Sequence, residues 1–351
     1  MDKKDIFFDD FNLISKKHDF SLLKNSTIFI TGSTGLIGSQ IVLFLDYLNQ
    51  MQKFNIKILA LIRSEKKAKS IFGDVIQRIK LIYGDIMDLP EISEPIDYVI
   101  HGASITDSKT FIEKPVETIS TALDGSRNVI KQFIGKDIKS FVYLSSLEVY
   151  GSFPNNEGIK RVCEADSGYI NTLSIRSSYS ESKRMVENIC ISYVSEFNIP
   201  IKIVRLCQTF GPGVKYSDNR VFAQFARSVI EGKDIVLKTK GETVRNYCYT
   251  ADAISGILIV LIKGFAGEAY NIANPYSTIS IADLAHLYCS LFSKSNAKVI
   301  FDIVEDAEKL GYNPILKLEL DSSKLVNLGW IPITSLEDSI KKLVHYMLEN
   351  K

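Results

Sequence analysis

The chain is poor in the residues that mark several specialised protein classes. Of its 351 residues, only four are histidine, five are cysteine and one is tryptophan. The cysteines are scattered and lack the spacing of a zinc site or a disulfide framework. They are Cys163, Cys190, Cys207, Cys248 and Cys289. This pattern is typical of small buried hydrophobic residues in a reducing compartment, and we expect no metal site.

The sequence also lacks a charge excess and a long apolar run. Its 42 basic and 41 acidic residues give a net charge of +1, which provides no basis for a nucleic-acid partner. The apolar run at 254–262 is too short to span a membrane. Residues 1–10 are charged and lack the apolar core of a secretory signal. We therefore expect a cytoplasmic protein with neither a membrane nor a nucleic-acid partner.

Strand and helix patterns alternate through the first part of the chain. Strands are predicted at 27–31, 56–62, 79–83, 98–101, 140–145 and 201–206. Helices are predicted at 36–47, from 65 onward, at 118–133 and at 179–196. This alternation indicates a parallel sheet covered by helices on both faces, with right-handed connections. We therefore expect an α/β protein with a doubly wound Rossmann parallel sheet.

Three regions follow from this pattern. Residues 1–23 are polar and aromatic without a clear period, and we expect an N-terminal extension there. Residues 24–206 are expected to form the Rossmann dinucleotide-binding domain. Residues 207–351 are expected to form mainly a smaller substrate-binding lobe, with 267–273 returning to the main sheet and 335–348 forming a terminal helix. We expect the active site where the two parts meet.

A glycine-rich loop follows the first predicted strand and precedes a predicted helix. Residues 31–38 fit the pattern T-G-x-x-G-x-x-G. Spaced glycines permit a tight turn and the close approach of a pyrophosphate, and the helix N-terminus offers N–H groups and a positive dipole end. The pattern in this context predicts dinucleotide binding. The expected cofactor-binding residues are Gly32, Thr34, Gly35, Leu36, Ile37 and Gly38.

The end of the second predicted strand bears on the choice of cofactor. An acidic residue there would bind the adenosine ribose hydroxyls and select NAD. Ile62 occupies that place and Arg63 follows it. Arg63 can pair with a 2′-phosphate, so the charges favour NADP over NAD, with a solvated loop arginine as the alternative. Asp85 and Ile86, after the third strand, are expected at the adenine ring.

A tyrosine and a lysine stand four residues apart in a predicted helix, so Tyr179 and Lys183 lie on one helix face. A nearby cation stabilises a phenolate and lowers the pKa of tyrosine from its usual value of about 10. Tyr179 can therefore act as a general base on a substrate hydroxyl while hydride leaves for a nicotinamide. Ser146 and Glu148 lie at the end of an earlier strand, where a hydroxyl can bond the reacting oxygen.

Together these motifs resemble those of the extended short-chain dehydrogenases/reductases, the NAD-dependent family of nucleotide-sugar epimerases, dehydratases and decarboxylases. The resemblance runs from about residue 24 to about residue 345 and includes the segments 205–212, 241–252 and 321–330. It implies that Ser146 is the catalytic hydroxyl, that Tyr179 is the base and that Lys183 is its partner. The last two would also contact the bound NAD or NADP, which the family retains and recycles.

The resemblance further implies a nucleotide-sugar substrate, UDP-linked by preference, and a homodimer formed through a four-helix contact. Gln208, Arg220 and Arg245 would bind the substrate, with Arg245 on its pyrophosphate because the guanidinium fork suits phosphate. Three features depart from the family pattern: Gln208 and Ala122 each replace a common asparagine, and the acid at the end of the second predicted strand is missing.

The residue between Ser146 and Glu148 bears on which reaction follows oxidation at C4 of the sugar. Leu147 replaces an aspartate of the family's dehydratases, which disfavours 4,6-dehydration because that reaction needs an acid for the leaving hydroxyl. We expect a UDP-glucuronate decarboxylase-like activity or 4-epimerisation of a UDP-sugar, with Glu148 positioning the sugar ring, or alternatively only hydrogen-bonding a nearby backbone or side chain. The alternatives are a 4-ketoreductase, a 4,6-dehydratase, or a non-catalytic protein that senses the dinucleotide, against which the intact Ser-Tyr-Lys set argues.

Overall fold

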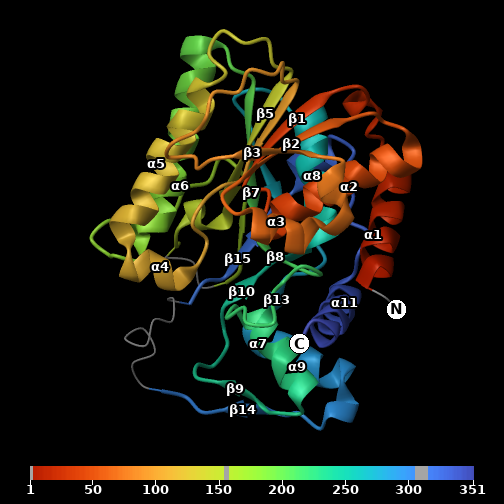
Figure 1. Cartoon of the computed structure of the whole chain (residues 1–351). Coiled ribbons are helices and arrows are strands. Elements are labelled where there is room, and N and C mark those ends of the chain that lie inside the picture. The colour runs from red at the N-terminus through yellow and green to blue at the C-terminus, as the bar shows by residue number, and fades with distance from the viewer. Residues whose placement is uncertain (1–2, 154–157, 305–314) are drawn as a thin grey trace.

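The computed structural model describes residues 3–153, 158–304 and 315–351, so the first two residues of the expected N-terminal extension lie outside it. Seven parallel strands form the central sheet in the spatial order β12-β7-β5-β4-β1-β2-β3 (Figure 1). They are β1 (Thr27–Thr31), β2 (Lys57–Ile62), β3 (Lys80–Tyr83), β4 (Tyr98–His101), β5 (Ser140–Ser146), β7 (Ile201–Leu206) and β12 (Ala269–Ile272). The predicted doubly wound Rossmann sheet is confirmed.

The strand order reverses between β1 and β4, because the chain crosses from the edge strand β3 back to the far side of β1. In open parallel sheets ligands bind outside the carboxyl ends of the strands at such a switch point. The glycine loop follows β1 directly, and the catalytic residues expected after β5 lie one strand beyond β4. The topology therefore gathers the candidate site at one end of the sheet.

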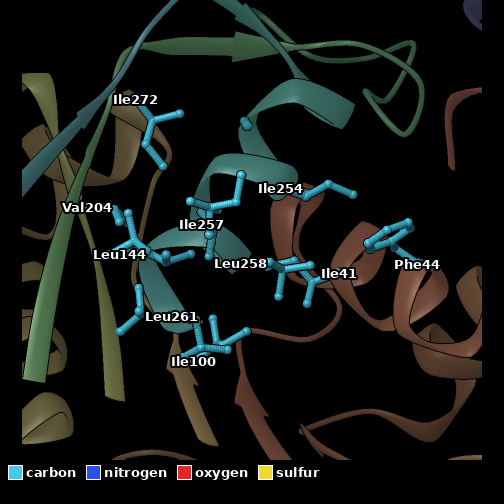
Figure 2. Packing of buried hydrophobic residues seen from close by; sticks show 14 of the residues in the cluster. Ile41, Phe44, Ile100, Leu144, Val204, Ile254, Ile257, Leu258, Leu261 and Ile272 are labelled. Carbon is cyan, nitrogen blue, oxygen red and sulfur yellow. The ribbon is translucent and has the colours of Figure 1, made fainter. Parts of the chain in front are cut away.

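Helices cover both faces of the sheet, and side chains alternate between them along each strand (Figure 1). One face carries α2 (Leu36–Gln52) and α8 (Thr250–Lys263), and the other carries α5 (Pro115–Lys131) and α6 (Ser177–Phe197). In β1, for example, Ile28 and Ile30 belong to the first core cluster and Phe29 belongs to the second. Figure 2 shows α8 packed between the sheet and α2. The labelled contacts come from Ile41, Phe44, Ile100, Leu144, Val204, Ile254, Ile257, Leu258, Leu261 and Ile272.

The N-terminal extension forms a helix, α1 (Lys3–Lys17), which packs against α2, α8 and α11 (Leu336–Glu349). The inference that this region has no clear period was wrong. Ile6 and Ile14 are buried at a helical spacing, but Asp10 stands between them in the same stripe. The Asp10 carboxylate is itself buried, where it accepts hydrogen bonds from Tyr249 (2.5 Å) and Lys342 (2.5 Å). A polar residue inside the buried stripe hid the helical pattern.

The smaller lobe has its own core, built on α7 (Val221–Glu231), α9 (Ile281–Leu291) and α11 and centred on residues such as Phe210, Phe222 and Leu284. Several pairs of short strands lie outside the central sheet. These pairs are β8 (Gln208–Phe210) with β11 (Tyr247–Tyr249), β9 (Ile235–Leu237) with β14 (Val299–Phe301), β10 (Val244–Arg245) with β13 (Ile279–Ser280), and β6 (Lys160–Val162) with β15 (Leu318–Leu320). The remaining short helices include α3 (Glu65–Phe72), α4 (Ser108–Glu113) and α10 (Ser323–Val326).

The cysteines only partly follow the expected pattern. Cys190, Cys207 and Cys248 are buried, whereas Cys289 is half-buried and Cys163 is exposed, so the expectation that all are buried was wrong. Cys163 lies in a turn after β6, where its backbone N–H donates to Asp166 (2.8 Å). Within the described ranges, no helix is long and apolar enough to cross a membrane.

Candidate active site

The glycine loop between β1 and α2 is shaped by close backbone contacts. Gly32 has a positive φ of +69°, and a Cβ there would lie 2.6 Å from the carbonyl carbon of Gly102 at the end of β4. The Gly35 N–H donates to the Gly32 carbonyl (2.9 Å), which closes the turn. Gly35 is exposed and provides no side chain to cap α2. The first N–H groups of that helix are therefore available to an anion, as a dinucleotide pyrophosphate requires.

Side chains anchor this loop to the sheet. The Ser33 hydroxyl donates to the Leu61 carbonyl of β2 (2.6 Å). The His101 ring lies within hydrogen-bond distance of Thr31 (2.7 Å) and of Ser126 on α5 (2.9 Å). Burial, and then the nearby Lys183 charge, lower the pKa of His101 to about 3. His101 is therefore neutral at working pH and joins β1, β4 and α5.

The residues expected at the adenosine end are Arg63, Asp85 and Ile86. The Arg63 side chain is 80% exposed and pairs with Asp85 at 3.3 Å. Ile86 is buried against Gly125 of α5, so its side chain belongs to the core. Sequence reasoning missed Lys67 on α3: burial, and then repulsion by Lys215 and Arg63, lower its pKa. Three cations from three segments thus lie near the end of β2.

The structure brings Ser146, Tyr179 and Lys183 together at the end of β5. Lys183 is only 3% exposed, and its ammonium donates to the Leu144 carbonyl of β5 (2.8 Å). The same ammonium lies 5.8 Å from the centre of the Tyr179 ring and 4.8 Å from that of Tyr143. Burial lowers the pKa of Lys183 to about 8. The cation is thus held beside the phenol, as the four-residue spacing predicts.

The Tyr179 phenol is buried and surrounded by charge. Burial, and then the Glu148 carboxylate, raise its pKa, whereas the Ser146 hydroxyl, Arg176 and Arg220 lower it. Phe111 of α4 stacks on the Tyr179 ring, with 4.3 Å between ring centres and 12° between the planes. The net effect is a raised pKa, so the expectation that a neighbouring lysine lowers the pKa of Tyr179 was wrong: burial and Glu148 outweigh the Ser146 hydroxyl and the two guanidinium groups that favour the phenolate.

Glu148 lies beside this set in a pair that sequence reasoning missed. Its two carboxylate oxygens accept from the Arg176 guanidinium at 2.8 and 3.0 Å, and one also accepts from the Ser180 hydroxyl at 2.8 Å. Leu147, the neighbour of Glu148, is buried. The one available signal was that Arg176 precedes Tyr179 by three residues, which places the two on one helix face.

The residues expected to bind substrate lie in the second half of the chain. Gln208 begins β8, which pairs with β11, and Arg220 precedes α7 and pairs with Asp218 at 2.6 Å. Arg245 ends β10, and its Nε is buried without a hydrogen-bond partner among the described residues. A buried unpaired donor is unfavourable, so a ligand that provides an acceptor would relieve it. Arg245 thus fits the expected contact with a pyrophosphate.

This fold and site define a Rossmann protein with a glycine-rich loop after the first strand and a buried tyrosine-lysine pair. The chain matches the model of the NAD dependent epimerase/dehydratase family over residues 28–273, and it belongs to that family. The family resemblance drawn from the motifs is therefore confirmed. Since the curated relatives that it matches include decarboxylases and dehydratases, its assignment as an enzyme is confirmed as well.

Two curated relatives and one solved structure illustrate the likeness. The chain is 28% identical over 320 residues to UDP-glucuronic acid decarboxylase 3 of Arabidopsis thaliana, covering 90% of this chain and 87% of that one. It is 27% identical over 326 residues to UDP-N-acetyl-alpha-D-glucosaminuronate decarboxylase of Bacillus cytotoxicus, covering 91% and 97%. The structure of UDP-glucuronic acid 4-epimerase from Bacillus cereus with NAD superposes with a TM-score of 0.75 at 22% identity, covering 93% and 100%.

Proposed function

We propose that this chain oxidises a UDP-linked sugar at C4 with a bound nicotinamide dinucleotide, and that it removes the C6 carboxylate of a UDP-hexuronic acid as carbon dioxide. The observation that supports the proposal is the convergence of Ser146, Tyr179 and Lys183 at the carboxyl end of β5, at the same edge of the sheet as the glycine loop that follows β1. The names of the relatives support the substrate class, since both decarboxylases described above act on UDP-linked uronic acids.

The chain's own residues divide the work of the first step. When bound, the dinucleotide provides the hydride acceptor. Tyr179 takes the proton of the C4 hydroxyl, Lys183 stabilises the phenolate and Ser146 bonds the oxygen that becomes the ketone. The ketone makes the sugar a β-keto acid. The C5–C6 bond then breaks and carbon dioxide leaves, the bond's electron pair moves to the C4 oxygen, and that oxygen is stabilised by the same two hydroxyl groups. A proton from water then adds to C5, and the hydride returns to C4 while Tyr179 gives its proton back to the C4 oxygen, which yields a UDP-pentose and restores the oxidised dinucleotide.

Two features near Ser146 support decarboxylation over 4,6-dehydration. Dehydration needs an acid for the leaving C6 hydroxyl. Leu147 is buried and apolar, and the Glu148 carboxylate is already bound by Arg176 and Ser180. Decarboxylation needs no such acid because the ketone accepts the electrons. The second candidate function, 4-epimerisation, also needs no additional acid. It differs from decarboxylation in its product.

Product analysis tests the proposed function. The protein is incubated with UDP-glucuronate, UDP-N-acetylglucosaminuronate, UDP-glucose, UDP-galactose and dTDP-glucose, and the products are identified by NMR. We expect a UDP-pentose from a uronate. A 4-keto-6-deoxy product would contradict the argument from Leu147. Persistent absence of reduced-nicotinamide absorbance with every sugar would favour the dinucleotide-sensing alternative.

We further propose that the cofactor is NADP in preference to NAD. Ile62 occupies the place at the end of β2 where an acid would bind the ribose hydroxyls, and Arg63, Lys67 and Lys215 provide positive charge nearby. Asp85 competes for Arg63 in the structure. We expect NADP to bind more tightly than NAD, and Arg63→Ala to reduce the preference by about 1–3 kcal/mol. The dissociation constants of both dinucleotides provide the check, and a preference for NAD that the substitution leaves unchanged would refute the idea.

The charge of Lys183 gives the proposed reaction a pH dependence. Lys183→Ala removes the cation beside Tyr179, so the phenol pKa rises and the pH profile of turnover moves upward by about 1 unit or more. The wild-type lysine also affects stability: its pKa falls from 10.5 unfolded to about 8 folded. Between about pH 8 and pH 10.5, Lys183 is protonated in the unfolded chain but largely neutral in the folded one. Its contribution to the free energy of unfolding therefore increases as the pH rises through this range.

Two measurements check this prediction. One is the pH profile of turnover, which would be unchanged by Lys183→Ala if the lysine were only structural. The other is urea unfolding of wild type and variant at about pH 8 and pH 10. The free energy of unfolding of wild type, relative to that of Lys183→Ala, should increase as the pH rises. A constant difference would show that Lys183 keeps an ordinary pKa.

A homodimer remains our proposal for the assembly. The helices α5 and α6 pack side by side and expose large apolar side chains, which would suit a four-helix contact with a second copy. Val116 is 75% exposed and Met185 is 50% exposed, and Ile119 and Ile191 on the same helices are exposed as well. A second copy that pairs these helices would cover them.

A further inference from the structure

The ion pair between Arg176 and Glu148 joins two segments that flank the catalytic tyrosine. Glu148 lies in the short helix 147–150 directly after β5, and Arg176 is the N-cap residue of α6. Ser180, the residue after Tyr179, completes the set by donating to the same carboxylate. The pair is bidentate and only about a quarter exposed on each side, with 24% for Arg176 and 26% for Glu148. Bidentate geometry and partial burial make such a pair stronger than a solvated one.

Arg176 also contacts the aromatic wall behind Tyr179. Its guanidinium lies over the Phe111 ring, 5.0 Å from the ring centre, and Phe111 stacks directly on Tyr179. The Phe111 carbonyl accepts from the Ser178 hydroxyl of α6 (3.1 Å), which fixes α4 to the same helix. Arg176 therefore touches both groups that border the phenol, the carboxylate on one element and the ring on another.

The ionised groups near Tyr179 lie in the segment after β5, on α6 and at the start of α7. Lys183 on α6 lies 5.8 Å from the ring centre, and Arg220 acts from the start of α7. The neutral Ser146 and the buried Tyr143 come from β5, and α4 contributes no ionised group to this set. Glu148 is thus the one negative charge among the groups found to act on Tyr179, and it disfavours the phenolate. Its neighbour Arg176 offsets that effect.

We propose that Arg176 is a positioning residue for the catalytic base: it neutralises Glu148 beside Tyr179 and keeps Phe111 seated on the phenol ring. The inference rests on the proposed function, since it assigns Tyr179 the role of base. It also gives Glu148 a role that differs from direct contact with the sugar. Glu148 fixes the start of α6 because it accepts hydrogen bonds from Arg176 and Ser180. Because the positive charge of Arg176 compensates the negative charge of Glu148, the pair determines how readily Tyr179 loses its proton.

A charge cycle tests the proposal with Arg176→Met, Glu148→Gln and the double variant. Tyr179 is replaced by a ring-fluorinated tyrosine, whose more acidic phenol titrates within the pH range that the fold tolerates, and its ¹⁹F chemical shift is followed against pH. We expect the midpoint to move up by about 1 pH unit in Arg176→Met, to move down in Glu148→Gln and to return close to wild type in the double variant. Lys109→Met, which removes an exposed charge of α4, serves as the matched control and should not move it.

Shifts in the same direction for both single variants, or no shift in either, would show that the pair is merely structural. If Arg176→Met does not fold, as judged by near-ultraviolet circular dichroism, Arg176→Lys takes its place. Lysine keeps the charge but loses the bidentate fork, so we expect a smaller upward shift, and a downward shift overturns the proposal. Because the ¹⁹F titration needs no turnover, the proposal can be separated from the proposed function. A protein that shows the charge cycle but converts no sugar nucleotide would refute the function alone.

Discussion

Replacing Tyr179 with phenylalanine is expected to lower turnover by a factor of about 10²–10⁴ while leaving dinucleotide binding nearly unchanged. The phenol oxygen is the only atom removed, and the ring keeps its stacking on Phe111. The proton of the sugar hydroxyl would then have no acceptor at that place. The glycine loop and the uncapped start of α2, which would hold the dinucleotide, are untouched.

The measurement compares turnover of UDP-glucuronate with the dissociation constant of the dinucleotide for wild type and variant. Tyr193→Phe provides the matched control, because it makes the same change on the same helix, away from the Ser146–Lys183 set. Near-normal turnover in Tyr179→Phe would remove the residue from its assigned role. Equal losses of turnover in Tyr179→Phe and Tyr193→Phe would mean that any tyrosine-to-phenylalanine change on α6 impairs the protein.

Gly32→Ala is expected to abolish dinucleotide binding and to destabilise the fold. Its backbone has a φ of +69°, which costs a residue with a Cβ about 1–2 kcal/mol. The added Cβ would also overlap the backbone of Gly102 and Ala103, which cannot move without disturbing β4. Relief of such overlap typically costs about 1–3 kcal/mol more and would displace the loop that cradles the pyrophosphate.

Gly135→Ala separates the cost of the positive φ from the cost of steric overlap with β4. Gly135 has nearly the same φ, +71°, but no heavy atom lies within 4 Å of the position of its Cβ. We expect this control to lose only the conformational part of the stability and to bind the dinucleotide normally. Urea unfolding and dinucleotide titration of both variants provide the check. Similar behaviour of the two alanine variants would show that crowding against β4 plays no part.

The sequence predicted the sheet well because its strands are short, apolar and separated by turn residues. The predicted strands at 98–101 and 201–206 have the same bounds as β4 and β7. Helix ends were less accurate, and α2 continues to Gln52, beyond the predicted residue 47. The helix α1 was missed because Asp10, a buried acid, interrupts its apolar stripe. Its partner Lys342 lies at the other end of the chain, where no local pattern can reveal it.

The candidate site shows the same division between local and long-range information. The Tyr179–Lys183 pair could be predicted because both residues lie on one helix, where spacing determines proximity. Two ion pairs could not be predicted in this way: that of Glu148 with Arg176 and that of Arg63 with Asp85. Each joins segments more than twenty residues apart, and each changes the charge that a substrate or cofactor would meet. Tertiary contacts therefore modify the electrostatics of a site whose main residues the motifs reveal.

The most direct test of the account follows the wild-type protein as it reacts with UDP-glucuronate. Reduced-nicotinamide absorbance is recorded in stopped flow, and the products are identified by NMR in the same samples. We expect a transient rise and fall of that absorbance, release of carbon dioxide and formation of a UDP-pentose. Formation of UDP-galacturonate without carbon dioxide would replace decarboxylation by 4-epimerisation. Absence of any reduced nicotinamide with this and the other sugar nucleotides would contradict the claim that the chain oxidises its substrate.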